Sequence, residues 1–293
     1  MTYHQFVKEV ETRVREGVAD NISVRIHLVV KNNGCKKQGI MITEEGINIS
    51  PTIYLEEYYQ QFQSGETLEE IIGKILKCYE EARFHRSWES SFFCCYNKVK
   101  PLIVYKVISK ERNAELLEEI PYKEVMDLAL VCYVLVELNP YQTATVLIRK
   151  EHLELWNVTE EEVFEEAGKN VRRLLPAKLN RMKDVLACMM NLDFEEDNDE
   201  DFMYVMSNEE KNYGAVCIFY EGVMEMVYAA IHENYYIVPS SVHEVIILPE
   251  SMAPKKQEIE EVVVMMNETQ VEREEVLSDK VYYYNGEKKQ LSM

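Results

Sequence analysis

The chain has 293 residues, of which 47% are hydrophobic and 29% are charged, a composition typical of a folded protein and not of a disordered one. Its 52 acidic and 32 basic residues give a net charge of -20, which repels the phosphates of nucleic acids and the surfaces of anionic membranes. Nucleic acids and membranes are therefore excluded as expected partners.

The cysteines and the N-terminus predict a cytoplasmic protein. The seven cysteines are odd in number and scattered, and no Cys-x-x-Cys occurs, so we expect reduced thiols and neither a disulfide framework nor a zinc site. The stretch Met1–Val10 lacks the basic and then apolar character of a signal peptide, and the apolar stretches are too short to span a bilayer.

The first part of the chain predicts a helix followed by a strand hairpin. Apolar residues at helical spacing predict a helix over 2–17, and alternating apolar and polar residues over 24–31 predict a half-buried strand. The dipeptide Asn33-Gly34 favours a tight turn, because both residues tolerate a positive φ, and 39–43 is the expected returning strand. The stretch 47–55 contains a proline and is expected to be either an edge strand or an extended link.

Two predicted helices complete a small N-terminal lobe. The first covers 55–63, and the second begins at Thr67, which forms a capping-box pattern with Glu70. We therefore predict an N-terminal α-β-β-α lobe over 1–86 and a main α+β domain over 87–293.

The main domain is expected to combine strand hairpins with helices. Strands are predicted on both sides of a Pro-Ser-Ser corner within 235–249, and at 101–108, 125–137, 143–149, 202–206, 215–220 and 280–284. Helices are predicted at 109–120, 159–171, 176–190, 222–231 and 255–267. Hairpins interrupted by helices are typical of an α+β fold with mostly antiparallel strands, here with a small N-terminal α-β-β lobe and a larger C-terminal mixed lobe.

The run 193–201 is acidic and is expected to be a solvated loop. It resembles a calcium-binding loop only in composition, because no register places a glycine at the sixth position and a closing glutamate at the twelfth. We expect no metal there.

The stretch from Tyr235 to Pro249 carries the strongest candidates for a functional site. Two apolar, β-branched runs flank a corner that brings together a hydroxyl, an imidazole and a carboxylate from Ser241, His243 and Glu244. Side chains two positions apart on a strand share a face, so a strand here lets Ser241 and His243 touch. One interpretation is a nucleophile with its base, and the favoured one is a serine-capped turn with a hydrogen-bonded histidine at a sheet edge.

Known catalytic motifs are incomplete in this chain. His243-Glu244 lacks the second histidine of a zinc-protease helix, because position 247 is Ile. No Gly-x-Ser-x-Gly elbow, phosphate-binding loop or dinucleotide-binding loop occurs, so we expect no cofactor.

Three further polar residues stand in apolar or helical surroundings. Asp127 lies within the apolar run 125–136, either at the entrance of a strand or as a functional carboxylate. Asn170 and Asn267 are expected either to cap helices or to serve as site amides.

Several phrases spread along the chain are specific as an ensemble. They are Asn48–Leu55, Asn113–Leu117 with Pro121, Asp127–Ala129, Ala144–Ile148 running to Trp156, Gly214-Ala215, Pro239–Ile246 and Leu277–Tyr282. Together they resemble a bacterial family of uncharacterised proteins, DUF5688, found in Gram-positive gut anaerobes. The resemblance covers nearly the whole chain and implies no activity, substrate or catalytic residue, so no functional residue is carried over.

Three functions remain open from the sequence. The first is a binding or regulatory module without catalytic activity and with a protein partner, because acidic faces with many tyrosines and methionines offer an adaptable contact surface. The second is a hydrolase-type enzyme that uses Ser241, His243 and Glu244, with Asp127. The third is an acidic decoy that occupies the basic groove of a nucleic-acid-binding protein. The first ranks ahead because no complete catalytic motif occurs.

Overall fold

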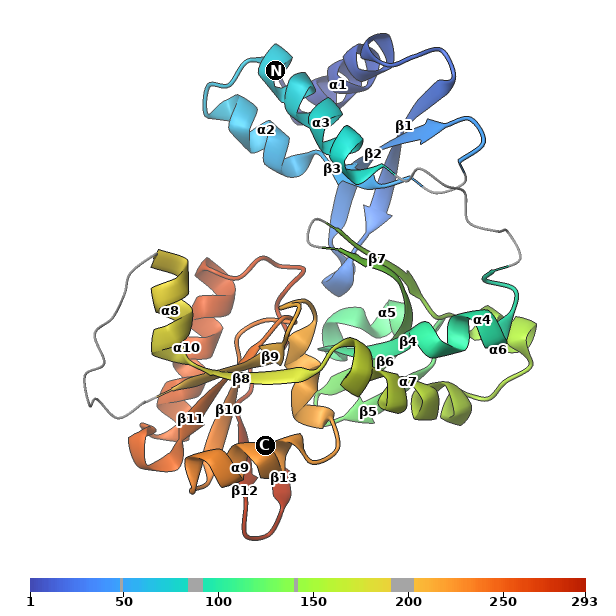
Figure 1. Ribbon diagram of the computed structural model, residues 1–293. Helices are drawn as coiled ribbons and strands as arrows, with labels where there is room; N and C mark the ends of the chain where they lie inside the picture. Colours follow the sequence, from blue (N-terminus) through green and yellow to red (C-terminus); the bar gives the residue numbers. More distant parts are fainter. Residues whose placement is uncertain (48–49, 84–91, 140–141, 191–202) are drawn as a thin grey trace. The chain divides into compact units, whose positions relative to one another are not determined.

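The computed structural model describes residues 1–47, 50–83, 92–139, 142–190 and 203–293. The chain forms two compact units, one of Met1–Cys95 with Glu137–Ala144 and the other of Tyr96–Val136 with Thr145–Met293 (Figure 1). The predicted boundary after residue 86 and the predicted acidic loop at 193–201 both lie outside the described residues, so the two predicted domains stay a prediction.

The first unit combines a three-stranded antiparallel sheet with three helices (Figure 1). The strands have the order β1-β2-β3, so the proline-containing segment lies at an edge of the sheet, as expected. The elements are α1 (Tyr3–Gly17), β1 (Ile22–Val30), β2 (Lys36–Glu44), β3 (Thr52–Tyr54), α2 (Glu56–Gln63) and α3 (Leu68–Ala82).

One face of this sheet packs against the helices to form the core of the first unit. Val24 lies opposite Ile42 and Ile26 opposite Ile40, so even-numbered side chains of both strands share the inner face. The most deeply buried partners on the helices are Phe6, Val10, Val14, Ile71 and Ile75.

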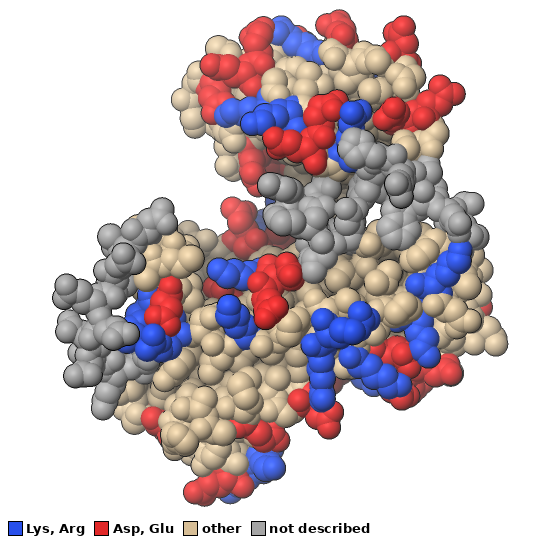
Figure 2. Space-filling model, viewed as in Figure 1, with Lys and Arg blue, Asp and Glu red and all other residues tan. Residues whose placement is uncertain are grey.

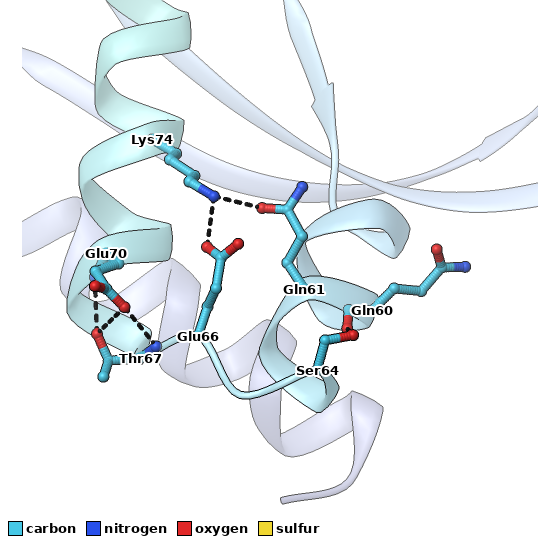
Figure 3. A network of polar contacts seen from close by, with 7 residues as sticks. All are labelled: Gln60, Gln61, Ser64, Glu66, Thr67, Glu70 and Lys74. Atoms are coloured by element: carbon cyan, nitrogen blue, oxygen red, sulfur yellow. Dashed lines mark hydrogen bonds and ion pairs between the residues drawn. The ribbon is translucent and has the colours of Figure 1, made fainter.

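The junction between α2 and α3 is held by polar contacts (Figure 3). The Thr67 backbone N–H donates to Glu70 Oε2 at 2.9 Å, and the Glu70 N–H donates to Thr67 Oγ1 at 3.3 Å, which confirms the predicted capping box. Lys74 Nζ donates to Gln61 Oε1 of α2 at 3.0 Å and lies 2.5 Å from Glu66 Oε2. These bonds satisfy free amides of the first turn of α3 and tie α3 to the end of α2.

The second unit contains two antiparallel sheets and several helices, which with the first unit confirms the α+β class. One sheet has the order β4-β6-β5 with β7 paired to β6, and the other has the order β13-β12-β10-β11-β9-β8. The strands are β4 (Ile103–Ser109), β5 (Tyr122–Val125), β6 (Leu128–Asn139), β7 (Gln142–Leu147), β8 (Ala177–Arg181), β9 (Tyr204–Asn208), β10 (Tyr235–Pro239), β11 (Val245–Pro249), β12 (Tyr282–Asn285) and β13 (Gln290–Ser292). The end of β6 and the start of β7 belong to the first unit.

The α-helices of the second unit are mostly short. They are α4 (Tyr96–Val99), α5 (Ala114–Leu117), α6 (Lys150–Trp156), α7 (Glu160–Leu174), α8 (Met182–Met190), α9 (Val223–Ile231) and α10 (Lys256–Thr269). Asn170 on the buried side of α7 donates from Nδ2 to the carbonyls of Lys100 at 2.8 Å and Ile103 at 2.9 Å. This amide therefore ties α7 to the start of β4 and does not cap a helix.

Two predicted elements of the second unit are wrong. The expected strand at 215–220 is a buried 3₁₀ helix, Gly214–Phe219, because a continuous apolar run carries no periodicity that separates a strand from a helix. The expected helix at 176–190 is divided between β8 and α8, since 177–181 pairs with β9 and only the following residues are helical.

Candidate functional site

The candidate residues Ser241, His243 and Glu244 lie in the turn that joins β10 to β11. The expectation that they lie on a strand is wrong, because 240–244 contains no strand residue. The Ser241 N–H donates to the Glu244 carbonyl at 3.2 Å, and Ser241 Oγ accepts the His243 backbone N–H at 3.0 Å. A serine that binds the amide two residues later stabilises a turn, so local chemistry bends the chain here.

Both nitrogens of the His243 ring face protein groups. Nδ1 accepts the backbone N–H of Tyr213 at 3.2 Å, and Nε2 lies 3.4 Å from Glu275 Oε1. Because Nδ1 is an acceptor, a neutral ring carries its proton on Nε2 and points it at Glu275. The side chains of His243 and Glu275 are 31% and 38% exposed, so water also reaches this pair.

The His243 ring is also part of a stack. Its centroid lies 5.5 Å from that of Tyr213, with 21° between the planes. Lys106 Nζ of β4 lies 4.0 Å from the Tyr213 ring centroid, and the Tyr133 ring of β6 meets Tyr213 edge-on at 6.0 Å. Cation–π and aromatic contacts therefore connect the turn to the sheet that contains β4 and β6.

The backbone of β9 and of Gly214 lies close to the backbone of the same turn. Ser207 Oγ of β9 donates to the His243 carbonyl at 2.8 Å. A Cβ added to Gly214 would lie 2.2 Å from Ser207 Oγ, 2.5 Å from the Asn208 nitrogen and 2.7 Å from the His243 oxygen. Only a glycine fits at position 214 without movement of the neighbouring backbone.

Asp127 lies immediately before β6, at the entrance of that strand. Its Oδ2 accepts the Ser278 hydroxyl at 2.6 Å and its Oδ1 accepts the Tyr282 hydroxyl at 2.7 Å. The Asp127 carbonyl accepts the Lys110 N–H at 3.1 Å. Burial raises the pKa of Tyr282 well above its usual value, so this phenol stays a proton donor to the carboxylate.

Asp279, the residue after Ser278, extends the group of polar contacts around Asp127. Asn267 of α10 donates from Nδ2 to Asp279 Oδ1 at 2.7 Å and to the Ser278 carbonyl at 3.0 Å. Arg112 Nη2 lies 3.0 Å from Asp279 Oδ2. Asn267 therefore anchors the segment after α10 and does not cap the helix.

The segment Glu275–Asp279 connects the two clusters. At one end, the Val242 N–H donates to the Glu275 carbonyl at 2.8 Å and the Glu275 side chain faces His243. At the other end, Ser278 binds Asp127. The structure thus groups Ser241, His243 and Glu244 in one turn. This turn contacts the Glu275 end of the segment Glu275–Asp279, and Asp127 contacts Ser278 near the other end.

Sequence reasoning missed the partners of the candidates. Tyr213, Glu275, Ser278 and Tyr282 belong to no local motif, and hydrogen bonds over such separations leave no pattern in the sequence. Only Gly214 gave a signal, since an isolated glycine beside an apolar run indicates a close approach of backbone.

Two of the three thiols of the second unit, those of Cys132 and Cys217, lie in surroundings that suppress their reactivity, whereas Cys188 is exposed. Cys132 and Cys217 are both buried, and burial raises the pKa of the Cys217 thiol to about 12. Burial also raises the pKa of Cys132. A thiol is nucleophilic only as the thiolate, so these two cysteines are packing residues.

The residues that the structure describes show neither a cluster of metal ligands nor a membrane-spanning helix. Those residues contain no group of three or more His, Cys, Asp or Glu side chains placed to hold a metal ion. None of the helices in the described parts combines the length and the apolar character needed to cross a membrane.

Comparison with known proteins assigns the chain to a family. Residues 3–286 match the family described as "Family of unknown function (DUF5688)", so the chain belongs to this family and the resemblance of its phrases is confirmed. Searches of curated proteins and of solved structures found no match.

Proposed function

We propose that this protein is a binding or regulatory module without catalytic activity. The observation that supports the proposal is that the candidate polar groups contact other groups of the protein. Both ring nitrogens of His243 and both carboxylate oxygens of Asp127 engage groups of the protein itself. These contacts hold the segment Glu275–Asp279 in place, which is a structural task.

A catalytic base needs a free lone pair within hydrogen-bond distance of the proton it removes. Here Nδ1 of His243 already accepts a backbone N–H, and the Ser241 hydroxyl oxygen accepts the His243 amide. A proton transfer from Ser241 to the ring requires both contacts to break. This supports the module over the enzyme.

The proposal includes a cytoplasmic location. In the part of the chain that the structure describes, none of the seven cysteines forms a disulfide, which fits a reducing compartment. Measuring the distribution of the protein between cytoplasmic and secreted fractions tests this part.

Affinity capture from native lysate tests the binding function. The tagged full chain is expected to recover a stoichiometric protein partner that the tag alone does not. Recovery of no such partner across growth conditions and salt concentrations would contradict the module.

The hydrolase that uses Ser241, His243, Glu244 and Asp127 is the second candidate, favoured by the grouping of the first three in one turn. Esterase, phosphatase and peptidase substrates are to be compared on the wild type, His243→Ala and the matched control His4→Ala, whose residue lies exposed on α1. An activity lost only in His243→Ala would favour the enzyme. Equal activities in all three rule this site out.

The acidic decoy requires one dense acidic face. On the face shown in Figure 2, Lys and Arg side chains are interspersed with Asp and Glu. This mixed distribution favours the binding module over the decoy.

A further inference from the structure

The β1–β2 hairpin of the first unit is basic although the chain as a whole is acidic. No Asp or Glu occurs from Asn21 to Thr43, whereas the whole chain carries 52 acidic and 32 basic residues. The basic residues in this stretch are Arg25, Lys31, Lys36 and Lys37. Charge of one sign on one hairpin creates a local field opposite to that of the net charge.

The outer edge of β1 presents unused backbone groups. The Val24 carbonyl accepts Arg15 Nη2 at 3.1 Å and the Ile22 N–H donates to the Ala19 carbonyl at 2.9 Å, so even-numbered residues of β1 point their backbone groups away from β2. The Lys31 N–H donates to the Cys35 carbonyl of the hairpin at 2.7 Å, so odd-numbered residues point toward β2.

Three residues therefore direct both an N–H and a C=O to the open edge. They are Ile26, Leu28 and Val30. Among the described residues β1 lies at the end of the strand order β1-β2-β3, and no described strand pairs with this edge. An open edge of this kind is a template for one more strand.

The side chains along the edge differ between the two faces of the sheet. Leu28 and Val30 are 58% and 65% exposed on one face. Arg25 and His27 are exposed on the other, and Arg25 forms no ion pair with a described residue. Lys31 Nζ lies 4.2 Å from the ring centroid of Tyr54 on β3, the strand at the opposite end of the order β1-β2-β3, so this cation is directed across the sheet and Arg25 is the cation beside the open edge.

We propose that the open edge of β1 binds an extended acidic segment of a partner protein as an added strand. Backbone groups of Ile26, Leu28 and Val30 supply the hydrogen bonds, and alternate side chains of the partner meet the two faces. Acidic residues face Arg25 and His27, and apolar residues lie beside Leu28 and Val30. The inference rests on the proposed binding function and names the class of partner.

The charges near β1 favour an acidic peptide over a second copy of the chain and over nucleic acid. A second copy of the chain would bring one basic β1 edge against another, and like charges on paired strands are destabilising. Nucleic acid is repelled by the net charge of -20, and its phosphates have no donor for the outward carbonyls of β1. An acidic peptide matches both the basic side chains and the backbone pattern.

Fluorescence anisotropy with a labelled synthetic peptide tests the proposal. The probe alternates Glu and Val and matches β1 in length. One control peptide has the same composition with its Glu residues grouped together, and another carries N-methyl groups on alternate amides, which removes the donors of an added strand. We expect saturable binding of the probe to the full chain and binding at least about tenfold weaker for both controls.

Three variants test whether the peptide binds at the open edge of β1. Leu28→Pro removes an outward N–H that the pairing with β2 does not use, and proline is tolerated on such an edge. Arg25→Glu reverses a charge beside the edge. Lys77→Glu on α3, where the side chain is 76% exposed, makes the same charge change elsewhere. We expect at least about tenfold weaker binding for the first two variants and unchanged binding for the third.

The contrary outcomes are distinct. Equal binding to all variants overturns the inference, and so does binding of duplex DNA that depends on Arg25 but not on Leu28. Dimers that Leu28→Pro abolishes would assign the edge to a second copy. If Leu28→Pro does not fold, the N-methylated peptide against the wild type tests the same hydrogen bonds. A lysate partner captured equally by wild type and Arg25→Glu would keep the proposed function and overturn this inference.

Discussion

Tyr213 and His243 lie stacked, with ring centroids 5.5 Å apart, and the Tyr213 backbone N–H donates to His243 Nδ1 at 3.2 Å. Tyr213 also meets Lys106 of β4, whose Nζ is 4.0 Å from the ring centroid. One tyrosine thus contacts a turn of one sheet and a strand of the other. Its ring and its backbone N–H, not its hydroxyl, make these contacts.

The first prediction separates ring from hydroxyl at position 213. Tyr213→Ala should lower the free energy of unfolding by about 1–3 kcal/mol, because it removes an aromatic stack and a cation–π contact. Tyr213→Phe keeps both contacts and should change it by less than about 0.5 kcal/mol. Urea unfolding of both variants provides the measurement, and equal losses would assign the effect to the hydroxyl.

The second prediction concerns the carboxylate of Asp127. Asp127→Ala should lower the free energy of unfolding by about 2–3 kcal/mol, because the hydroxyls of Ser278 and Tyr282 lose a charged acceptor. Tyr282→Phe should cost about 1–2 kcal/mol, and the double variant should cost less than the sum. The control is Tyr283→Phe, whose hydroxyl meets the exposed Glu250 at 3.0 Å and should contribute little. Additive losses in the cycle would contradict coupling of the two side chains.

The third prediction compares two glycines. Gly214→Ala should destabilise the protein by about 1–3 kcal/mol, because its Cβ would meet backbone atoms that have no room to move. Gly73→Ala on α3 should stabilise it by about 0.5–1 kcal/mol, since nothing lies within 4 Å of the added Cβ and alanine favours a helix. Thermal unfolding of both variants checks the opposite signs, and a neutral Gly214→Ala would show that the turn tolerates expansion.

The fourth prediction is a pH dependence at the start of α6. His152 Nδ1 accepts the Arg149 N–H at 3.0 Å, its ring stacks on Trp156, and burial lowers its pKa. The folded state therefore favours the neutral ring, so the unfolded state binds more protons as the pH falls below its pKa of about 6.5. This contribution to stability is complete above about pH 6.5 and is lost as the pH falls through the lower folded pKa.

His152→Gln isolates that contribution, because a glutamine at this position still accepts the Arg149 N–H but does not titrate. The free energy of unfolding of the wild type, relative to that of His152→Gln, should fall as the pH is lowered from about 8 to about 5. The slope should correspond to the uptake of less than one proton on unfolding. Chemical denaturation across this range measures it. A difference that does not vary with pH would show that the histidine is solvated like an unfolded one.

Local chemistry explains which elements were predictable. The Asn33-Gly34 turn and the capping box of Thr67 with Glu70 depend on neighbours within a few residues, so the sequence alone locates them. A proline likewise marks β3 as an edge strand. These features determine the hairpin and helix ends of the first unit.

The candidate site was predictable only as a set of residues. Ser241 turns the chain by binding the His243 amide, so the corner lies in a turn although its flanks are strands. The groups that fix the His243 ring come from Tyr213 and Glu275, and no local pattern indicates either one. Tertiary contacts decide what the side chains at this corner do.

The hydrogen-bond partners of Asp127 are synthesised long after Asp127 itself. Ser278 and Tyr282 follow it by 151 and 155 residues, so β6 leaves the ribosome long before its entrance carboxylate is satisfied. Until then the Asp127 carboxylate lacks both hydroxyl donors, and the apolar strand beside it is not yet covered by the rest of the second unit. The polar contacts of the β6 entrance can therefore form only after Ser278 and Tyr282 have been synthesised.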